Sequence, residues 1–582
     1  MFRARNPAGG ARQSDVTVVV TAHDASPLKK GHGYGVDFEN GAARVDDGSF
    51  QSRFTRLAHY LHAPTHSSTI AVFRMLYALS VLAQLYKWDN MFLKFSKSIL
   101  VLPYPGFSWI RPLSPEGGFL LISVCKLASF CQLIGFMTPV ATTIAWFTFT
   151  WLFNICESNF NNHYILMCHM LFLGMFLQWG HWFSIDRLIG RWRGRPVDSH
   201  VPFWNLLLLR MIMTLPYLYG SFAKMNSDWL FRAEPVTMWF KDRGGLYSHP
   251  LFPWFICWTG MLFDLTIGFF LFYRPTRYLI GFPGALCFNF SNKIMFNIGV
   301  FPFMMVCSLT LFLEPNVPAR IVSWITRVNV DESAMATKPA KPAEKTWHWG
   351  LTRTQWFGML FVGCFLTFHS MFPFREKVMY PGNPSWHEEG HFGAWHMKLR
   401  TKKGFVNLNL VDSTGQNYTI DPKMDPFVHR SQNNYFMKPH CLILYVGRLK
   451  QIFEAAGTPL QSVMANNCFG LNSRPGHHLY KEDVNLLDFV GKYELFGVSG
   501  ARQSPNSPYK WLWKDEEGPS CDIRQPSDAR DDAKYGTRKG LLPVYGRAGI
   551  IYRKAPYSNK EALFWKDPRD GYKYAYLMPM IE

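Results

Sequence analysis

The sequence lacks the short motifs by which many soluble enzymes are identified. It contains no CxxC pair, no P-loop, no GxGxxG and no GxSxG string. Zinc-ribbon, iron–sulfur, nucleotide-dependent and serine-nucleophile chemistries therefore have no support. An apolar run followed by a small-residue cleavage site is also missing near the N-terminus, so we predict no cleavable signal peptide.

Acidic residues are scarce relative to basic ones. The chain has 41 Asp and Glu against 61 Lys and Arg, a formal net charge of +20. Much of this excess lies in short loops beside apolar segments, so it predicts membrane topology signals and no nucleic-acid partner. Of the 11 cysteines, most fall inside apolar segments. Those in the later, more polar part are Cys441, Cys468 and Cys521.

Long apolar segments of low charge are abundant before residue 373. We predict that they cross a hydrocarbon layer of roughly 30 Å as helices. They lie near residues 67–87, 117–136, 139–156, 163–179, 203–223, 254–272, 277–290, 297–313 and 355–372. The predicted fold is a polytopic α-helical membrane bundle of about nine transmembrane helices, followed by a β-rich lumenal or extracytoplasmic C-terminal domain.

Composition divides the chain into three predicted domains. Residues 1–55 form a disordered cytoplasmic tail, because they are polar and rich in Gly, Ser, Asp and Arg. Residues 56–372 form a transmembrane domain, with a charged cytoplasmic linker at 315–354. Residues 373–582 form a lumenal β-rich domain.

The basic loops predict the orientation of this bundle. Those after the fourth, sixth and eighth segments fall on one face, which should be cytoplasmic together with the N-terminus. The region after residue 373 then lies on the opposite side. Asn417 begins an Asn-Tyr-Thr glycosylation triplet there, which favours lumenal exposure.

Sequence alternation predicts local structure in the last part of the chain. Phe405–Val411 and Leu442–Val446 read as strands and Gly447–Ala456 as a short helix. Residues 500–560 are dense in Pro, Gly and charge and are predicted to be long loops.

Ionisable residues inside apolar segments are the most informative, because each is costly unless it is paired or faces a cavity. Arg210, Tyr217 and Lys224 recur every seven residues and form one stripe along a helix. At about 1.5 Å per residue, Arg210 lies roughly 21 Å from Lys224, which is at the lumenal end. The stripe is predicted to face the bundle interior.

Lys224 has two interpretations. One is an interfacial lysine whose ammonium reaches the headgroup region. The other is a base, because an apolar pocket favours the neutral amine. The residues that follow, Asn226, Asp228 and Trp229, are predicted to form a polar and aromatic cap.

A second polar group begins the fourth segment. Asn161-Asn162-His163 lies at the same predicted membrane face as Lys224, so we predict that these side chains converge on one site. A capping or interfacial role is the alternative for His163. Further buried polar candidates, for which structural pairing is predicted, are Arg74, Asp264 and Asn292.

Two histidine-containing strings in the last part invite a metal interpretation. They are His477-His478 and Trp386-His387-Glu388-Glu389. We predict no metal at either.

Several longer strings over about residues 65–490 carry a family resemblance through their order and spacing. In the helical part they are Asn161-Asn162-His163-Tyr164, His200-Val201-Pro202-Phe203-Trp204-Asn205, Leu209-Arg210, Lys224-Met225-Asn226-Ser227-Asp228-Trp229, Phe263-Asp264-Leu265, Gly268-Phe269 and Phe296-Asn297-Ile298-Gly299-Val300-Phe301. In the last part they are Trp386, Gly390, Trp395 and Met397 at fixed spacing, and Leu471-Asn472-Ser473-Arg474-Pro475. Together they resemble the vitamin K-dependent γ-glutamyl carboxylase family and its wider group of horizontally transferred transmembrane proteins.

The resemblance implies that residues 56–372 are the catalytic domain and that residues 373–582 present the peptide. It also implies a reaction and a site. Lys224 is the base that deprotonates vitamin K hydroquinone, and His163 with Asn162 lies beside it. Oxidation of the hydroquinone anion by O₂ then yields a base strong enough to remove the γ-proton of a peptidyl glutamate, whose carbanion attacks CO₂. The other pocket candidates are Arg210, Tyr217, Asn226, Asp228, Trp229, Asp264, Asn289 and Asn292.

The implied co-substrates are reduced vitamin K, CO₂ and O₂, without a metal. The implied partners are a Glu-containing peptide or protein, membrane lipid, a prenylated quinone and, indirectly, a quinone-epoxide reductase. The membrane is that of the endoplasmic reticulum in a eukaryote or the plasma membrane in a bacterium.

The chain also departs from the family pattern. Asn289 stands where a histidine is common, and segment 88–116 has no cysteine for the disulfide that ties this loop to the C-terminal domain in animal members. The long C-terminal extension of animal enzymes is also expected to be missing. These departures leave the recognition of a protein substrate open.

Carboxylation is therefore the predicted function, with two alternatives. One is a quinone oxygenase that acts on a different acceptor. The other is a non-catalytic membrane protein that binds lipid or peptide.

Overall fold

The computed structural model describes residues 49–97, 100–104, 106–195, 198–296, 298–327, 346–380, 382–425, 428, 430–491, 518–523, 550–554, 561–567 and 571–574. Residues 1–53 and 54–582 are two compact units, and the account below concerns the second. Most of the predicted tail 1–55, part of the linker 315–354 and much of the predicted loop region 500–560 lie outside the described residues.

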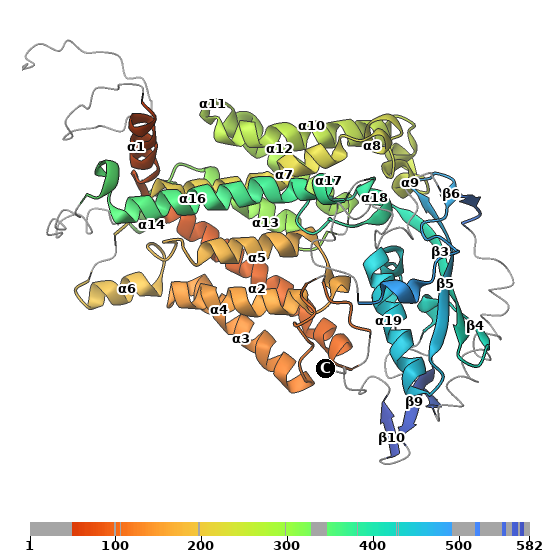
Figure 1. Ribbon diagram of the computed structural model, residues 1–582. Coiled ribbons are helices and arrows are strands. Elements are labelled where there is room, and N and C mark those ends of the chain that lie inside the picture. The colour runs from red at the N-terminus through yellow and green to blue at the C-terminus, as the bar shows by residue number, and fades with distance from the viewer. Residues whose placement is uncertain are drawn as a thin grey trace, which may run out of the picture. The chain divides into compact units, whose positions relative to one another are not determined.

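The first part of the second unit is almost entirely helical (Figure 1). Its main helices coincide with the predicted apolar segments. They are α2 (Ser68–Lys97), α3 (Pro115–Ile134), α4 (Thr138–Asn154), α5 (Asn162–Gly174), α7 (Phe203–Lys224), α10 (Phe252–Phe272), α12 (Phe282–Met295), α13 (Phe301–Ser308) and α16 (Arg353–Met371). Shorter helices connect them: α6 (Ile185–Trp192), α8 (Ser227–Phe231), α9 (Val236–Phe240), α11 (Arg274–Thr276), α14 (Val317–Thr326), α17 (Arg375–Met379) and α18 (Pro384–His387).

Five helices among the described residues are long and apolar enough to cross a membrane, and the chain is therefore a membrane protein. They cover Ser68–Asp89, Pro115–Ile134, Phe203–Lys224, Phe252–Phe272 and Arg353–Val378. The helices α4, α5, α12 and α13 are shorter, and 13 residues, the length of α5, span only about 20 Å. The prediction that these four also cross the membrane stays a prediction.

Helices α7 and α10 pack against each other but differ in burial. In the apolar 18-residue stretch of α7, 72% of the residues are buried, so the bundle encloses this helix on most sides. In the corresponding stretch of α10 only 28% of the residues are buried, so most of its apolar surface faces outward. In a membrane that surface contacts lipid, because no other apolar phase is available to it.

The later part contains a five-stranded antiparallel sheet of order β4-β3-β5-β6-β7. Its strands are β3 (Lys402–Asp412), β4 (Asn417–Ile420), β5 (Leu460–Leu471), β6 (Gly476–His477) and β7 (Ser520–Cys521). The central pair β3 and β5 aligns Phe405 with Cys468. A disulfide joins Cys468 to Cys521 and thereby links β5 to β7. A separate three-stranded sheet holds β8 (Ile550–Lys554), β9 (Glu561–Asp567) and β10 (Gly571–Tyr574).

These strands confirm part of the local predictions and correct others. Phe405–Val411 lies within β3, as predicted, whereas Ser520–Cys521 and Ile550–Lys554 are strands inside the predicted loop region. The predicted strand Leu442–Val446 was wrong, because it belongs to the helix α19 (Pro439–Ala455). A short apolar run fits a strand or a buried helix equally well, and here Leu442, Val446 and Leu449 are buried at helical spacing.

Candidate active site

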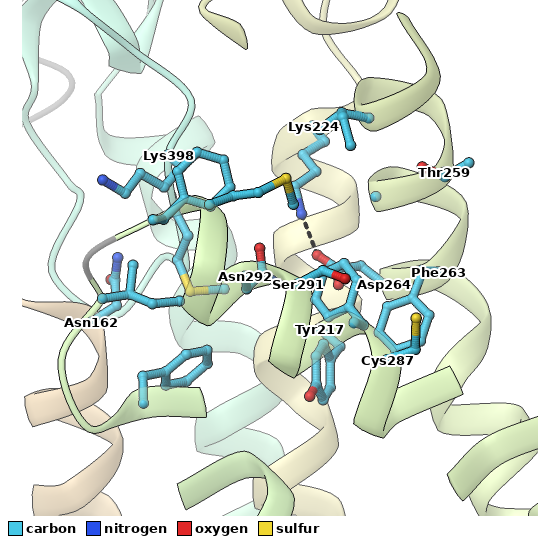
Figure 2. Close-up of a pocket in the computed structure, with 18 of the residues that line it drawn as sticks. Asn162, Tyr217, Lys224, Thr259, Phe263, Asp264, Cys287, Ser291, Asn292 and Lys398 are labelled. Carbon is cyan, nitrogen blue, oxygen red and sulfur yellow. Dashed lines mark hydrogen bonds and ion pairs between the residues drawn. The ribbon is translucent and has the colours of Figure 1, made fainter. Parts of the chain in front are cut away.

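A cavity of about 520 Å³ lies among α5, α7, α10, α12 and residues 397–398 (Figure 2). Its wall is mainly apolar and aromatic, with Phe255, Ile256, Phe263, Phe288, Met295, Phe296, Ile298, Phe301 and Met397. Its charged lining residues, among those described, are Lys224, Asp264 and Lys398. Neutral polar groups come from Asn161, Asn162, His163, Tyr217, Thr259, Ser291 and Asn292.

The predicted stripe on α7 is buried throughout, with Arg210, Tyr217 and Lys224 each under 9% exposed. Tyr217 and Lys224 line the cavity. Arg210 does not: its guanidinium donates to the carbonyl oxygens of Leu311 at 2.8 Å and Leu313 at 3.4 Å. One end of the stripe thus belongs to the cavity and the other to helix packing.

Lys224 forms a buried ion pair with Asp264 of α10, marked by a dashed line in Figure 2. Gly220, one turn earlier on α7, leaves room for this pair, since a Cβ there would lie 3.3 Å from the Asp264 carboxylate. The Lys224 ammonium also lies 5.7 Å from the ring centroid of Trp229, another cavity residue. The second carboxylate oxygen, Oδ1 of Asp264, has no hydrogen-bond partner among the described residues.

Asn162 and His163 reach the cavity from the N-terminus of α5. Asn161 just before it is extended, with φ of −152°, and starts the helix at this point. Asn162 donates to the carbonyl oxygen of His396 at 3.2 Å. Within the described part of the chain, Asn162 Oδ1 and His163 Nε2 have no partner although both are buried. Such orphaned polar atoms in a cavity wall are available to a ligand.

The predicted cap after Lys224 has two functions. Asn226 Oδ1 accepts a hydrogen bond from the backbone N–H of Trp229 at 3.0 Å, which starts α8. Asp228 points instead to the later region, where it accepts from Arg474 at 2.7 Å and from Asn472 at 2.9 Å. Of the cap residues predicted for the pocket, only Trp229 is part of the described cavity lining.

The two asparagines of α12 also differ. Asn292 lines the cavity. Asn289 donates to the Tyr217 hydroxyl at 3.0 Å and to the Ala285 carbonyl oxygen at 2.8 Å. Asn289 therefore acts on the cavity wall through Tyr217.

The motif Trp386, Gly390, Trp395, Met397 brings the later region to the cavity. Both tryptophans are 2% exposed, and Met397 lines the cavity. Gly390 has φ of +74°, and a Cβ there would lie 2.8 Å from the Tyr380 ring, so only glycine fits.

Comparison with family models identifies two regions. Residues 62–317 match the HTTM domain, and residues 354–497 match the lumenal domain of vitamin K-dependent gamma-carboxylase. The chain belongs to the vitamin K-dependent γ-carboxylase family. No solved structure matches it significantly.

The cavity of this γ-carboxylase family member has wall residues in both matched regions, since Lys224 lies in the first and Met397 in the second. Lys398, which follows Met397, was not predicted from the sequence. It stands in no apolar segment and has no periodic partner, so sequence patterns gave no signal for it.

A spacing typical of metal-binding histidines was also missed in the sequence. The string that starts at His387 continues to His391 and matches HExxH. In the structure α18 ends at His387, and Glu388 and Gly390 have positive φ, so the two histidines do not share a helix face. Glu388 is instead paired with Arg400 at 2.8 Å and with Lys402 at 3.3 Å.

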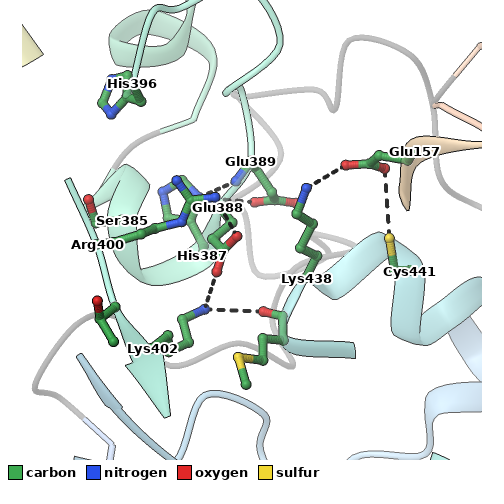
Figure 3. Close-up of polar contacts among 12 residues, drawn as sticks. Glu157, Ser385, His387, Glu388, Glu389, His396, Arg400, Lys402, Lys438 and Cys441 are labelled. Atoms are coloured by element: carbon green, nitrogen blue, oxygen red, sulfur yellow. Dashed lines mark hydrogen bonds and ion pairs between the residues drawn. The ribbon is translucent and has the colours of Figure 1, made fainter. Parts of the chain in front are cut away.

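Burial opposes ionisation of Glu388, but these two cations outweigh it and lower its pKa to about 2. Figure 3 shows this ion-pair cluster beside a second one centred on Glu157.

Glu157, in the short 3₁₀ helix before α5, pairs with Lys438 at 2.7 Å and with His440. Burial raises the pKa of Glu157, but His440 and Lys438 more than reverse this and hold it well below its usual range. Glu157, His440 and Cys441 could by spacing hold a metal ion. The ammonium of Lys438 already neutralises the carboxylate, so the arrangement has a sufficient structural explanation, and the absence of a metal stays a prediction.

Proposed function

We propose that this protein is a vitamin K-dependent carboxylase that converts peptidyl glutamate to γ-carboxyglutamate, coupled to oxidation of vitamin K hydroquinone to the epoxide. The observation that carries the proposal is the Lys224–Asp264 pair at the wall of an apolar cavity. In the resting pair Lys224 is an ammonium. Once it has lost that proton, the amine acts as the base, and Asp264 stabilises the ammonium that forms again when the amine accepts a proton. Residues 56–372 then form the catalytic domain, and residues 373–582 present the peptide.

The cavity suits a reduced quinone. Aromatic side chains such as Phe263 and Phe288 offer flat apolar surface, and the unpartnered atoms Asn162 Oδ1 and His163 Nε2 offer hydrogen bonds to hydroxyl groups. Oxidation of reduced vitamin K by O₂ would supply the strong base that a lysine cannot provide, since a glutamyl γ-hydrogen is far too weak an acid for an amine.

The residues of this chain have three tasks in that reaction. Lys224 removes a proton from the bound hydroxyl group, and Asn162 with His163 orients the oxygen atoms. The aromatic wall excludes water, which would otherwise quench reactive anions.

A prenylated quinone can enter this cavity from the membrane. Phe255 and Thr259 on α10 and Cys287 on α12 line the cavity and are exposed at the surface of the bundle. The outward face of α10 contacts lipid, so an opening between α10 and α12 faces the phase in which such a quinone dissolves.

The side of the membrane is also part of the proposal. The disulfide Cys468–Cys521 favours an oxidising compartment for the later region, and Asn417 is exposed on β4. Both observations support a lumenal or extracytoplasmic C-terminal region and a cytoplasmic N-terminus. The compartment is the endoplasmic reticulum in a eukaryote and the exterior of the plasma membrane in a bacterium.

Incorporation of labelled CO₂ into a Glu-containing peptide tests the function. Detergent-solubilised protein is assayed with and without reduced vitamin K, and wild type is compared with Lys224→Ala. Labelling that requires the hydroquinone and disappears in the variant supports the carboxylase. Accumulation of the quinone epoxide without any labelled peptide supports an oxygenase, and absence of both products supports a non-catalytic binding protein.

A further inference from the structure

The cavity contains more positive charge than its own carboxylate balances. Lys224 is neutralised by Asp264, which leaves Lys398 as the remaining charged residue of the described lining. Lys398 has no acidic or hydrogen-bonding partner in the part of the chain that the structure describes. Its ammonium lies 5.8 Å from the ring centroid of Trp239 and 5.7 Å from that of Phe296.

Aromatic neighbours hold this cation in place without cancelling its charge. Partial burial removes water from the ammonium and lowers the pKa of Lys398. A partly desolvated ammonium beside two rings gains free energy when an anion binds to it.

The backbone that carries Lys398 is anchored on both sides. The His396 carbonyl oxygen accepts from Asn162 at 3.2 Å, and the Leu399 carbonyl oxygen accepts from Asn472 at 3.2 Å. Between these anchors Lys398 has φ of +55°, in the left-handed region that side chains other than glycine rarely adopt. Such a conformation persists only where the surroundings hold it, and it often marks a functional position.

Figure 2 shows that the Lys398 ammonium points away from Lys224 and lies on the side of the cavity nearest Asn162. Lys398 is exposed, whereas Lys224 and Asp264 are buried. The part of the cavity beside Lys398 is therefore charged and open, and it is distinct from the part that lies between α10 and α12.

We infer that Lys398 binds the γ-carboxylate of the glutamyl residue that enters the cavity, and this inference rests on the proposed function. Removal of a proton from the carbon next to a carboxylate adds a second negative charge to the glutamyl side chain. A fixed ammonium at that carboxylate holds the substrate and offsets the added charge, while the Lys224–Asp264 pair, which is neutral overall, cannot.

Direct peptide binding tests this role without turnover. A fluorescent pentapeptide with one Glu, and the same peptide with Gln in its place, are titrated into detergent-solubilised full-length protein, and anisotropy gives each Kd. Wild type should bind the Glu peptide at least about tenfold more tightly than the Gln peptide. Lys398→Gln should abolish this preference, and Lys398→Arg should retain most of it.

Lys403→Gln is the matched control, because Lys403 is an exposed lysine on β3 outside the cavity lining. It removes the same charge and should leave the preference intact. An unchanged preference in Lys398→Gln overturns the inference, and so does an equal loss in Lys403→Gln, which would indicate a general effect of net charge.

The labelled-CO₂ assay separates this inference from the proposed function. Active wild type with an unchanged KM for the Glu peptide in Lys398→Gln contradicts the role of Lys398 alone. A Glu preference that depends on Lys398, in a protein that never incorporates CO₂, contradicts the carboxylase proposal and leaves a carboxylate-binding site.

Discussion

Two buried carboxylates, Asp264 in the helical region and Glu388 in the later region, are paired differently. Asp264 has one cation, Lys224, and one oxygen without a partner among the described residues. Glu388 is paired with both Arg400 and Lys402. The saturated carboxylate stabilises the fold, whereas the half-satisfied one lies at a cavity wall, where a ligand can complete its hydrogen bonds.

This comparison predicts that substitutions in the Lys224–Asp264 pair can change activity without changing stability. Lys224→Met should reduce carboxylation about 10²- to 10⁴-fold and destabilise the protein by roughly 3–5 kcal/mol, because Asp264 is left buried and unpaired. Adding Asp264→Leu should restore the melting temperature but not the activity, since apolar groups of similar volume replace the pair.

Thermal unfolding in detergent and labelled-CO₂ incorporation are measured on the same preparations. Activity regained in the double variant would show that Lys224 has no chemical role.

Substitution of a buried carboxylate that has two cationic partners should lower stability more than substitution of a carboxylate in an exposed ion pair. Glu157→Gln should cost roughly 3–5 kcal/mol, because the variant leaves Lys438 buried without its counter-charge. Glu454→Gln is the control, since Glu454 and Lys450 form an exposed i,i+4 pair 3.8 Å apart, worth less than about 1 kcal/mol. Equal shifts in melting temperature for the two variants would contradict this difference.

The pH dependence of stability tests the ion pairs of Glu388. The folded-state pKa of Glu388 is lowered from 4.5 to about 2, so its contribution is complete above pH 4.5 and is lost as the pH falls toward 2. Melting temperatures of wild type and Glu388→Gln should differ most near neutral pH, by an amount equivalent to roughly 3 kcal/mol. The two curves should converge at low pH, and a constant gap down to pH 2 would exclude this ionisation as the cause.

Loss of the neutral hydrogen bond between Asn289 and Tyr217, next to the cavity, should have the smallest effect on activity and stability. Asn289→Ala removes the donor to the Tyr217 hydroxyl and should cost about 1–3 kcal/mol of stability, with a loss of activity smaller than that of Lys224→Met. Asn292→Ala serves as a comparison, because Asn292 lines the cavity and should affect quinone affinity more. The ratio of KM for the quinone between the two variants is the measurement.

The sequence predicted those parts of the site that a local pattern carries. The seven-residue spacing of Arg210, Tyr217 and Lys224 was sufficient to predict a buried stripe. The spacing could not show that Lys224 lies at the cavity and that Arg210 packs against Leu311, because Lys224 and Arg210 are both cations within an apolar helix. That distinction depends on which carbonyl groups lie opposite.

Partners far apart in the sequence were not predictable from spacing. Asp264 follows Lys224 by 40 residues, on another helix, and Glu157 meets Lys438 across the two regions. Helix positions were predicted well, since apolar runs mark them, but their lengths were not. α5 ends at Gly174, where a Cβ would lie 2.2 Å from the Trp179 ring, so the position requires glycine.

The anchored segment around Lys398 has a consequence for how the protein can be divided. Met397 and Lys398 belong to the later region but form part of the cavity wall. A chain cut after α16 would keep Lys224, Asp264 and the opening toward lipid, yet one side of the cavity would be open to water. The membrane helices and the segment before the sheet therefore share one cavity, and neither region can be expected to form it as an independent module.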